Sequence, residues 1–216
     1  MGDEVGCTHP GVMRLPLPEP TLAGRRCLLR PWEVGDAATL AAAWSDREVR
    51  RWLPVPDQAD RAVAADWIAG EAVRRRAGLA LDLVAVEPGR GVPEGPDADP
   101  VGRLGNGSDV AVEAAADVLG EVGLSAFDPE DGVAMIGWWT VDRHRRRGVA
   151  TEMVSLLTTW ALGPPIGLDV LVAEVEPANP GSVAVALAAG YGEVGRRDDG
   201  RLVMAAGAMT RSGRRV

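Results

Sequence analysis

Ile136-Gly-Trp-Trp-Thr-Val-Asp-Arg-His-Arg-Arg-Arg-Gly-Val-Ala-Thr-Glu152 is the stretch that decides the fold of this chain. Its first half is rich in β-forming residues, and from Gly148 onward the apolar residues fall at helical spacing. The stretch therefore predicts a strand that leads through an arginine-rich turn into an amphipathic helix. Backbone N–H groups in the first turn of a helix lack internal partners and lie at the positive end of its dipole, so Arg147 to Thr151 are suited to hold a pyrophosphate. The alternative is that Arg143 to Arg147 form a solvated charge cluster.

The segments on either side predict further strands and helices. The β-rich runs 118–126 and 133–141 flank a turn-forming cluster, which predicts an antiparallel hairpin. Asp36 is suited to cap a helix, and Gly78 to follow one. The expected order is a strand at 27–30, a helix after Asp36, a helix at 60–77, a strand at 79–86, the hairpin, a helix from Gly148 to Gly163, a strand at 168–175, a helix at 180–189 and a hairpin turned at 198–200. This order predicts a mixed α/β (α+β) fold without an internal repeat.

Length and composition predict one globular domain. The chain has 216 residues, of which 46% are hydrophobic and 25% charged. It contains no run of eighteen apolar residues, and its N-terminus lacks the basic and apolar regions of an export signal, so we expect a cytoplasmic protein without membrane contact. The expected organisation is an N-terminal arm at 1–22, a domain at 23–207 with a mobile insertion at 88–117, and a C-terminal tail at 208–216.

Charge and cysteine content restrict the classes of partner. The formal net charge is -8, which disfavours nucleic acid and favours cationic ligands such as amines. Two cysteines, Cys7 and Cys27, and two histidines are too few for a disulfide scaffold or a zinc site, so no metal is expected. Cys27 is interpreted as a buried apolar residue, and His144 as a packing residue rather than a catalytic one.

Two motifs resemble those of the GNAT acyltransferase superfamily. Arg145, Gly148 and Ala150 match its acetyl-CoA motif, which has the form Arg/Gln-x-x-Gly-x-Gly/Ala and lies between a strand and a helix. Asn179-Pro-Gly-Ser182, followed by a helix that ends in Gly190-Tyr191, is similar to its second landmark.

Three flanking segments refine this resemblance. Leu28 to Trp32, Asp46 to Leu53 and Ile136 to Trp139 are similar to the branch that holds the ribosomal-protein N-terminal acetyltransferases. The resemblance extends over most of the chain, and it implies a mixed, mostly antiparallel sheet of about seven strands flanked by about four helices.

The resemblance implies an acetyl-CoA-dependent N-acetyltransferase that needs no metal. A primary amine, on a small molecule or at a protein N-terminus, would attack the thioester directly, and the enzyme would supply positioning, a proton acceptor and a proton donor. Acceptors in this superfamily bind between the first two helices and nearby loops. The expected state is a monomer or a homodimer. A non-catalytic acyl-CoA-binding sensor or regulatory module is the alternative, and turnover of the thioester with a panel of amines would separate the two.

The resemblance also implies which residues bind acetyl-CoA. The backbone of one strand pairs with the pantetheine arm, the turn and first helical residues hold the pyrophosphate, and the landmark asparagine steadies the arm. Asn179 is also suited to cap the helix that begins at Pro180, and it can serve both roles. The implied cofactor-binding residues are Trp139, Thr140, Val141, Arg145, Arg146, Arg147, Gly148, Val149, Ala150, Thr151 and Asn179.

The catalytic assignment departs from the common pattern of the family. Ala186 occupies the position at which many members carry a tyrosine that protonates the departing thiolate. Ser182 is therefore the expected donor, with a capping role for Ser182, or an ordered water as donor, as alternatives. Glu174 and Glu176 share one face of their strand and are both candidates for the base, of which Glu174 is the expected one. Glu121 is a rival, and each glutamate is also compatible with a merely solvated position. Trp138 or Trp139 is expected to contact a ligand.

Overall fold

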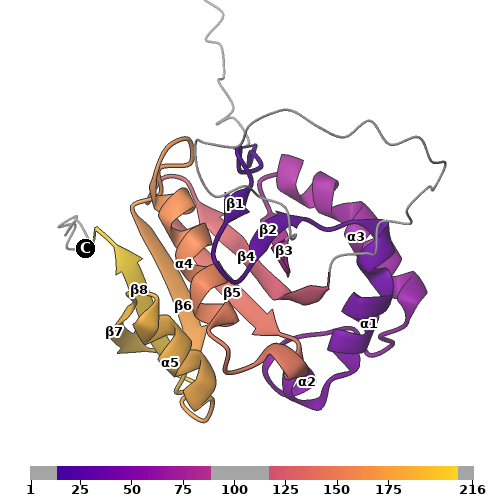
Figure 1. The fold of residues 1–216 in the computed structure, drawn as a ribbon. Helices are drawn as coiled ribbons and strands as arrows, with labels where there is room; N and C mark the ends of the chain where they lie inside the picture. Colours follow the sequence, from indigo (N-terminus) through magenta and orange to yellow (C-terminus); the bar gives the residue numbers. More distant parts are fainter. Residues whose placement is uncertain (1–13, 89–116, 209–216) are drawn as a thin grey trace, which may run out of the picture.

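The computed structural model describes residues 14–88 and 117–208, and these form an eight-stranded sheet with helices on both faces (Figure 1). The strand order is β1-β2-β3-β4-β5-β6-β8-β7, and only the β5–β6 pair is parallel. The strands are β1 Leu22–Ala23, β2 Leu28–Pro31, β3 Ala80–Val86, β4 Val118–Asp128, β5 Val133–Thr140, β6 Val170–Val175, β7 Gly192–Arg196 and β8 Leu202–Gly207. The α-helices are α1 Ala37–Ser45, α2 Arg47–Trp52, α3 Arg61–Arg76, α4 Val149–Leu162 and α5 Pro180–Ala188. The predicted mixed, mostly antiparallel fold is confirmed.

Alternation along β3 shows how the sheet separates two cores. Leu81 and Leu83 belong to the larger core, which includes Met153 and Leu157 of α4. Val84 points the other way, into a second core that contains the buried residues of α1 and α3. Since successive side chains of a strand face opposite sides, one run of buried residues serves both layers.

Tryptophans contribute much of the second core. Trp32 stacks on Trp139 with ring centroids 6.3 Å apart, and it packs edge-on against Trp67. Trp67 in turn meets Trp44 edge-on at 5.8 Å. This cluster fixes α1 and α3 over the strands that lead to the pocket described below.

The α4 helix connects the two parallel strands. Its buried residues include Val149, Met153, Leu157 and Ala161, which recur every four residues and form one stripe toward the sheet. Two parallel neighbours cannot be joined by a tight turn, so the chain must cross over the sheet through a helix. The N-terminus of α4 consequently lies just after the end of β5.

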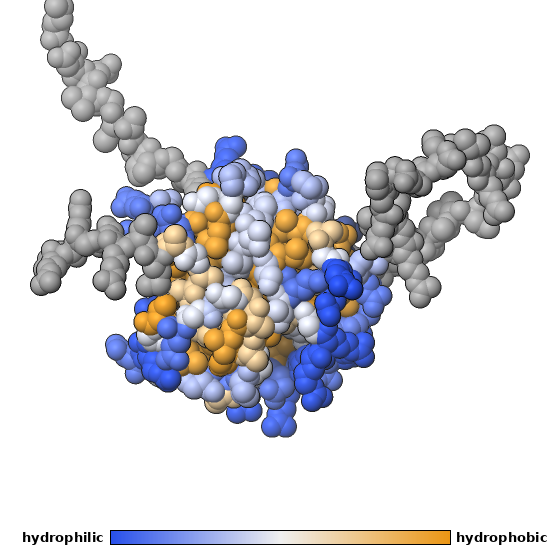
Figure 2. Space-filling view, turned by 60° about the vertical axis from the view of Figure 1, so that its left-hand side comes forward, coloured by the Kyte–Doolittle hydropathy of each residue, from blue (hydrophilic) through white to orange (hydrophobic). Residues whose placement is uncertain are grey.

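The face that carries α5, β7 and β8 mixes apolar and polar side chains (Figure 2). Every residue of the edge strand β7 is exposed, and Leu187 and Val194 are among the exposed large apolar residues. An ion pair between Arg196 and Glu193 lies on the same strand. Charged residues on an edge strand disfavour pairing with another chain.

Most of the predicted elements are present, and the differences have local causes. The predicted capping of a helix by Asp36 is wrong, because no hydrogen bond from its side chain caps α1. The carboxylate instead accepts from the Arg30 guanidinium at 2.7 and 2.9 Å and from the Glu33 N–H at 2.9 Å. The short elements β1 and α2 were not predicted, because their two and six residues are too few to show a strand or helix period in the sequence.

The described part of the predicted N-terminal arm packs on the domain. Leu15 is 2% exposed, its N–H donates to the Arg75 carbonyl oxygen at 3.3 Å, and β1 extends the sheet beyond β2. Cys7, most of the predicted insertion (89–116) and residues 209–216 of the predicted tail lie outside the described residues. Within the described ranges, no helix is long and apolar enough to cross a membrane.

Candidate active site

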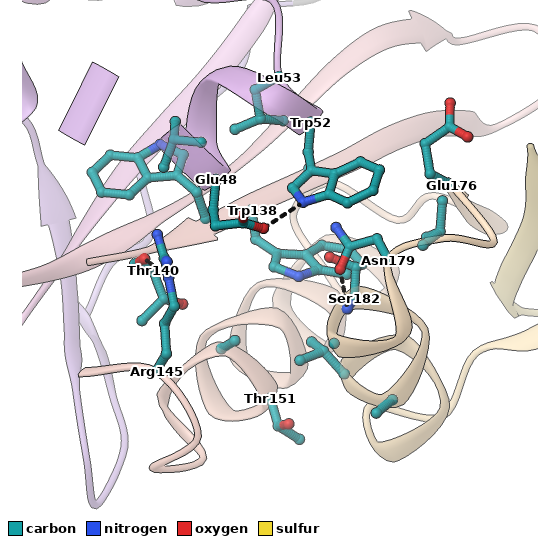
Figure 3. Close-up of a pocket in the computed structure, with 18 of the residues that line it drawn as sticks. Glu48, Trp52, Leu53, Trp138, Thr140, Arg145, Thr151, Glu176, Asn179 and Ser182 are labelled. Carbon is teal, nitrogen blue, oxygen red and sulfur yellow. Dashed lines mark hydrogen bonds between the residues drawn. The ribbon is translucent and has the colours of Figure 1, made fainter. Parts of the chain in front are cut away.

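A pocket of about 930 Å³ opens where β5 and β6 separate. The two strands pair only through Val133–Met135 and Val170–Val172, and both continue beyond this ladder. Residues from both continuations line the pocket together with α2 and the first turns of α4 and α5 (Figure 3). The lining contains these residues that the sequence predicted: Trp138, Trp139, Thr140, Arg145, Arg146, Gly148, Ala150, Thr151, Glu174, Asn179 and Ser182. Val141, Arg147 and Val149 are not among the lining residues.

One end of the pocket is the turn that precedes α4. Gly148 is the N-cap of α4 with φ of 79°, and Arg146 also has a positive φ, 58°. No side-chain hydrogen bond caps this helix, so its first N–H groups are left toward the pocket. An uncapped helix start whose backbone is tightly turned has the geometry and the dipole to bind a phosphate group.

A second segment fixes this turn from outside. The Glu152 carboxylate accepts the backbone N–H groups of Arg25, Arg26 and Cys27 at 3.2, 2.6 and 3.0 Å. Arg26 Nε then donates to the Arg147 carbonyl oxygen at 3.0 Å. The start of α4 is therefore held against the chain that leads into β2, in contacts that span more than a hundred residues of sequence.

The interpretation of Cys27 as a buried apolar residue is confirmed. Its side chain is fully buried, and burial, followed by the negative charge of Glu152, raises the pKa of the thiol to about 12. A thiol of this kind is not a nucleophile at neutral pH.

The Arg145 guanidinium is occupied by protein acceptors. Its Nε donates to the Thr140 carbonyl oxygen at 3.0 Å, and its terminal nitrogens reach Asp142 Oδ1 at 3.1 Å and Asp46 Oδ1 at 2.8 Å. Arg145 thus joins the end of β5 to the turn and to the N-cap of α2. His144, beside it, is buried, and its Nε2 lies 3.1 Å from Asp117 Oδ2.

The start of α5 brings Asn179 and Ser182 to the opposite wall. Asn179 Oδ1 accepts the Ser182 N–H at 3.1 Å, so Asn179 caps the helix and its amide nitrogen faces the pocket (Figure 3). In the described part of the chain, no hydrogen bond engages Ser182 Oγ. The capping function belongs to the asparagine and not to the serine side chain.

The two carboxyl groups considered as bases lie in different surroundings. Glu174, at the pocket, has a side chain only 7% exposed, and its oxygens contact the guanidinium groups of Arg197 at 2.5–2.6 Å and Arg201 at 2.6 Å. Glu121 is not among the lining residues; its oxygens accept the indole N–H groups of Trp32 at 2.9 Å and Trp139 at 3.2 Å. Burial, with a further contribution from the nearby negative charge of Asp82, raises the pKa of Glu121 to about 8.

The far end of the pocket contains residues that the sequence did not assign to the site. Glu48, Val49, Trp52 and Leu53 come from α2 and the residue after it, and Trp52 Nε1 donates to Glu48 Oε2 at 3.2 Å (Figure 3). Glu176, which the sequence made a candidate for the base beside Glu174, also lines the pocket and is exposed. The only sequence signal for this wall was that the segment 46–53 resembles one branch of the acyltransferases.

Two further observations bear on the chemistry. Tyr191, the single tyrosine of the chain, is buried in the larger core with its hydroxyl 2.7 Å from Thr158 Oγ1, and burial raises its pKa to about 12. Tyr191 therefore cannot act in place of the proton-donating tyrosine that many family members carry at the position of Ala186. Among the described residues, no group of three or more His, Cys, Asp and Glu side chains could hold a metal ion.

Comparison with known proteins gives one consistent family. Residues 26–192 match the family model of the acetyltransferase (GNAT) domain. A curated relative, described as the uncharacterized N-acetyltransferase p20 of Bacillus licheniformis, is 28% identical over 163 residues, which cover 76% of this chain and 77% of the relative.

Solved structures with the same fold agree with this match. The ribosomal-protein-S5-alanine acetyltransferase of Vibrio fischeri has a TM-score of 0.66 at 14% identity, over 88% of this chain and 97% of that one. RimJ of Mycobacterium smegmatis, solved in complex with CoA-disulfide, has a TM-score of 0.63 at 20% identity, over 84% and 82%. The family model thus confirms the resemblance to the GNAT superfamily, and the solved structures show the same fold.

Proposed function

Because this chain belongs to the GNAT acetyltransferase family and is thus an acetyl-CoA-dependent acyltransferase, we propose that it acetylates a primary amine by direct attack on the thioester. The observation that carries this proposal is the pocket itself. It runs from the uncapped N-terminus of α4, along the part of β5 that no longer pairs with β6, to a wall formed by α2. One end is suited to an anion, and the other is bordered by apolar and acidic side chains.

The residues at the turn are suited to hold acetyl-CoA. The N–H groups at the start of α4 would bind the pyrophosphate, and the backbone of Trp139 and Thr140 would pair with the pantetheine amides. The sequence predicted Val141 for this pairing too, but its N–H donates to the Leu119 carbonyl oxygen and its own carbonyl oxygen accepts the His144 N–H. The amide nitrogen of Asn179 would donate to the same arm. The thioester supplies an activated acetyl group, and this chain's residues position it.

We assign the proton donor to Ser182. As the new C–N bond forms and the C–S bond breaks, the departing sulfur takes a proton from Ser182 Oγ. Solvent water then returns a proton to Ser182 Oγ. The position of Ser182 in the pocket lining supports this role, and so does the capping of α5 by Asn179, which leaves the serine hydroxyl for other contacts. The burial of Tyr191 away from the pocket removes the alternative phenol.

We assign the proton acceptor to Glu174 rather than to Glu121. Glu174 borders the pocket, whereas Glu121 is enclosed by two indole rings on the other side of β5. Both oxygens of Glu174 are engaged by Arg197 and Arg201. Each carboxylate oxygen has two lone pairs, so Glu174 can accept the amine proton while Arg197 and Arg201 hold the carboxyl group in place.

We propose that the acceptor amine enters along α2. Trp52 and Leu53 would contact its apolar part, while Glu48 and Glu176 favour a cationic group. The net charge of -8 supports the same preference. Small cationic amines and protein N-termini both satisfy this description.

The test combines binding with turnover. Titration calorimetry should give a micromolar dissociation constant for acetyl-CoA, and a panel of amines and short peptides should include at least one that releases free CoA. The released thiol should appear in equal amount with the acetylated amine. Tight binding without CoA release from any amine would instead assign the protein as an acyl-CoA sensor.

A further inference from the structure

We infer that Arg145 and Asp46 form a positioning link that couples acetyl-CoA binding at the turn to the placement of α2, the wall of the acceptor site. The inference rests on the proposed function, since it assigns acetyl-CoA to the turn. It gives Arg145 a role other than contact with phosphate. Neither residue touches the reacting atoms in this scheme, and both act through the segments they join.

The first support is the direction of the Arg145 side chain. Arg145 occupies the first position of the cofactor motif, yet its guanidinium reaches across 99 residues of sequence to Asp46 Oδ1 at 2.8 Å. The same side chain holds the Thr140 carbonyl oxygen, where β5 ends. A guanidinium with several protein acceptors in a fixed fork is a rigid connector. Any ordering of the turn therefore acts on α2 through Arg145.

The second support is the place of Asp46 on α2. Asp46 is the N-cap, and its Oδ1 accepts the N–H groups of Glu48 at 2.9 Å and Val49 at 3.0 Å as well as the arginine. Burial alone would raise the pKa of Asp46, but the hydrogen bonds from Arg145 and from the α2 backbone, with the charge of Arg145, hold it below its ordinary value. One oxygen atom thus starts the helix and ties it to the cofactor turn.

The third support is that α2 has little else to fix it. The helix has six residues, too few to be stable in isolation, and Val49 is its only buried residue. Its other described side-chain attachments are long hydrogen bonds from Arg50 to the carbonyl oxygens of Trp44 and Pro56, at 3.4 and 3.3 Å. The link to Arg145 is shorter and charge-assisted, and it adds to the packing of Val49 in the second core and to the chain connection with α1.

The link makes binding of the two substrates cooperative. Acetyl-CoA orders the turn, the turn holds Arg145, and Arg145 holds α2 with Glu48 and Trp52 in position for the amine. Coupling free energies are reciprocal, so a bound amine should strengthen acetyl-CoA binding by the same factor.

Hydrogen exchange of the peptide that covers residues 47–53 tests the link without a known acceptor. In the wild-type protein, saturating acetyl-CoA should slow exchange in this peptide by about fivefold or more, a typical coupling between sites. In Asp46→Ser the slowing should disappear, while the dissociation constant of acetyl-CoA changes by less than about threefold, because Ser keeps the N-cap but does not reach Arg145. Asp46→Asn, which keeps a neutral acceptor, should retain part of the effect.

Asp60→Ser is the matched control. Asp60 caps α3 through a single bond to the Val63 N–H at 2.9 Å and is not among the pocket residues, so this variant should behave as the wild type. Once an amine is identified, Asp46→Ser should raise the KM of the amine and leave that of acetyl-CoA nearly unchanged.

Three results would overturn the inference. If α2 stays coupled to acetyl-CoA in Asp46→Ser, the link does not carry the effect. If Asp46→Ser weakens acetyl-CoA binding tenfold or more, the pair belongs to the cofactor site directly. If acetyl-CoA binds the wild type and protects 147–151 but not 47–53, the link is absent although the proposed function stands. Failure of the wild type to bind acetyl-CoA would overturn the proposed function, and the inference with it.

Discussion

The two ends of the pocket are built in different ways. The end proposed for the cofactor has backbone N–H groups from Gly148 to Thr151, and the contacts of Glu152 and Arg147 with Arg26 hold it against the chain before β2. The reaction end, with Glu48, Glu174 and Ser182, presents side chains from three separate elements. Backbone recognition needs only a local turn of defined shape, whereas side-chain recognition needs several segments to meet. We therefore expect cofactor binding and turnover to respond to different substitutions.

Replacing Ser182 by Ala should produce the largest effect and should separate the two ends. If Ser182 protonates the thiolate, the single-turnover rate of acetyl transfer should fall by about 10²- to 10⁴-fold, the range for general acid catalysis. Acetyl-CoA affinity and the melting temperature should change little, because Asn179 keeps the cap.

Ser155→Ala is the control for the Ser182 substitution. Ser155 lies on α4, outside this pocket, and its hydroxyl donates to the Thr151 carbonyl oxygen at 2.8 Å. A full rate in Ser182→Ala would leave water as the proton donor.

Replacing Gly148 by Glu should affect the other end alone. A side chain here meets Arg26 Nε at 3.1 Å from its first carbon, in a left-handed backbone, and brings a negative charge to the anion site. We expect acetyl-CoA to bind about 100-fold more weakly by calorimetry, equal to roughly 2.7 kcal/mol.

Gly167→Glu separates backbone strain from contact with the ligand. Gly167 has a similar φ of 68°, with no atoms near a built side chain, and it is not among the pocket residues. This variant should lose stability and keep its affinity. Equal affinity in Gly148→Glu would remove the phosphate site from this turn.

Replacing Glu152 by Gln tests whether the brace matters for binding. In a glutamine, an N–H₂ group replaces one of the two oxygens that accept the three backbone N–H groups. At least one of these N–H groups then has no acceptor, which should lower the free energy of unfolding by about 1–3 kcal/mol. A loosened turn should weaken acetyl-CoA binding by roughly threefold to tenfold, or about 0.7–1.4 kcal/mol. Chemical denaturation and calorimetry on one sample measure both. Lower stability with unaltered affinity would mean that the turn holds its shape without the brace.

Glu121→Gln should have the smallest effect on function, with cofactor binding and turnover unchanged, and should alter only the pH dependence of stability. The pKa of Glu121 in the folded protein, about 8, lies above its unfolded value, so between these values the folded state holds a proton that the unfolded state has lost. The stability contributed by this group is present at acid pH and is lost as the pH rises toward 8.

Urea denaturation at pH 5 and pH 8 measures this difference. The wild type should lose more stability than the variant over this interval, and the pH profile of turnover should not move. A shifted turnover profile would make Glu121 part of the reaction and would contradict the assignment to Glu174.

The sequence predicted best what depends on neighbouring residues. The turn, the amphipathic α4 and the Asn179 cap each arise within one short segment, where propensity and periodicity act directly. It predicted less well the α2 helix, whose six residues complete less than two turns and show no period. Asp36 illustrates the same limit, because its carboxylate accepts hydrogen bonds from Arg30 instead of capping α1.

Taken alone, the sequence determined the mixed fold, the family and the turn before α4, to which we assign the cofactor, because these follow from local motifs whose backbone conformation the residues themselves impose. Only the tertiary structure decided that Arg145 pairs with Asp46 and that Glu152 binds the chain before β2. It also decided that Glu174 contacts two guanidinium groups, whereas Glu121 accepts hydrogen bonds from two indoles. Except for the arginines of Glu174, these partners lie 89 to 127 residues apart or are on neighbouring strands. The physical reason is that the charge state and role of a polar side chain depend on which groups surround it after burial, and folding alone brings those groups together.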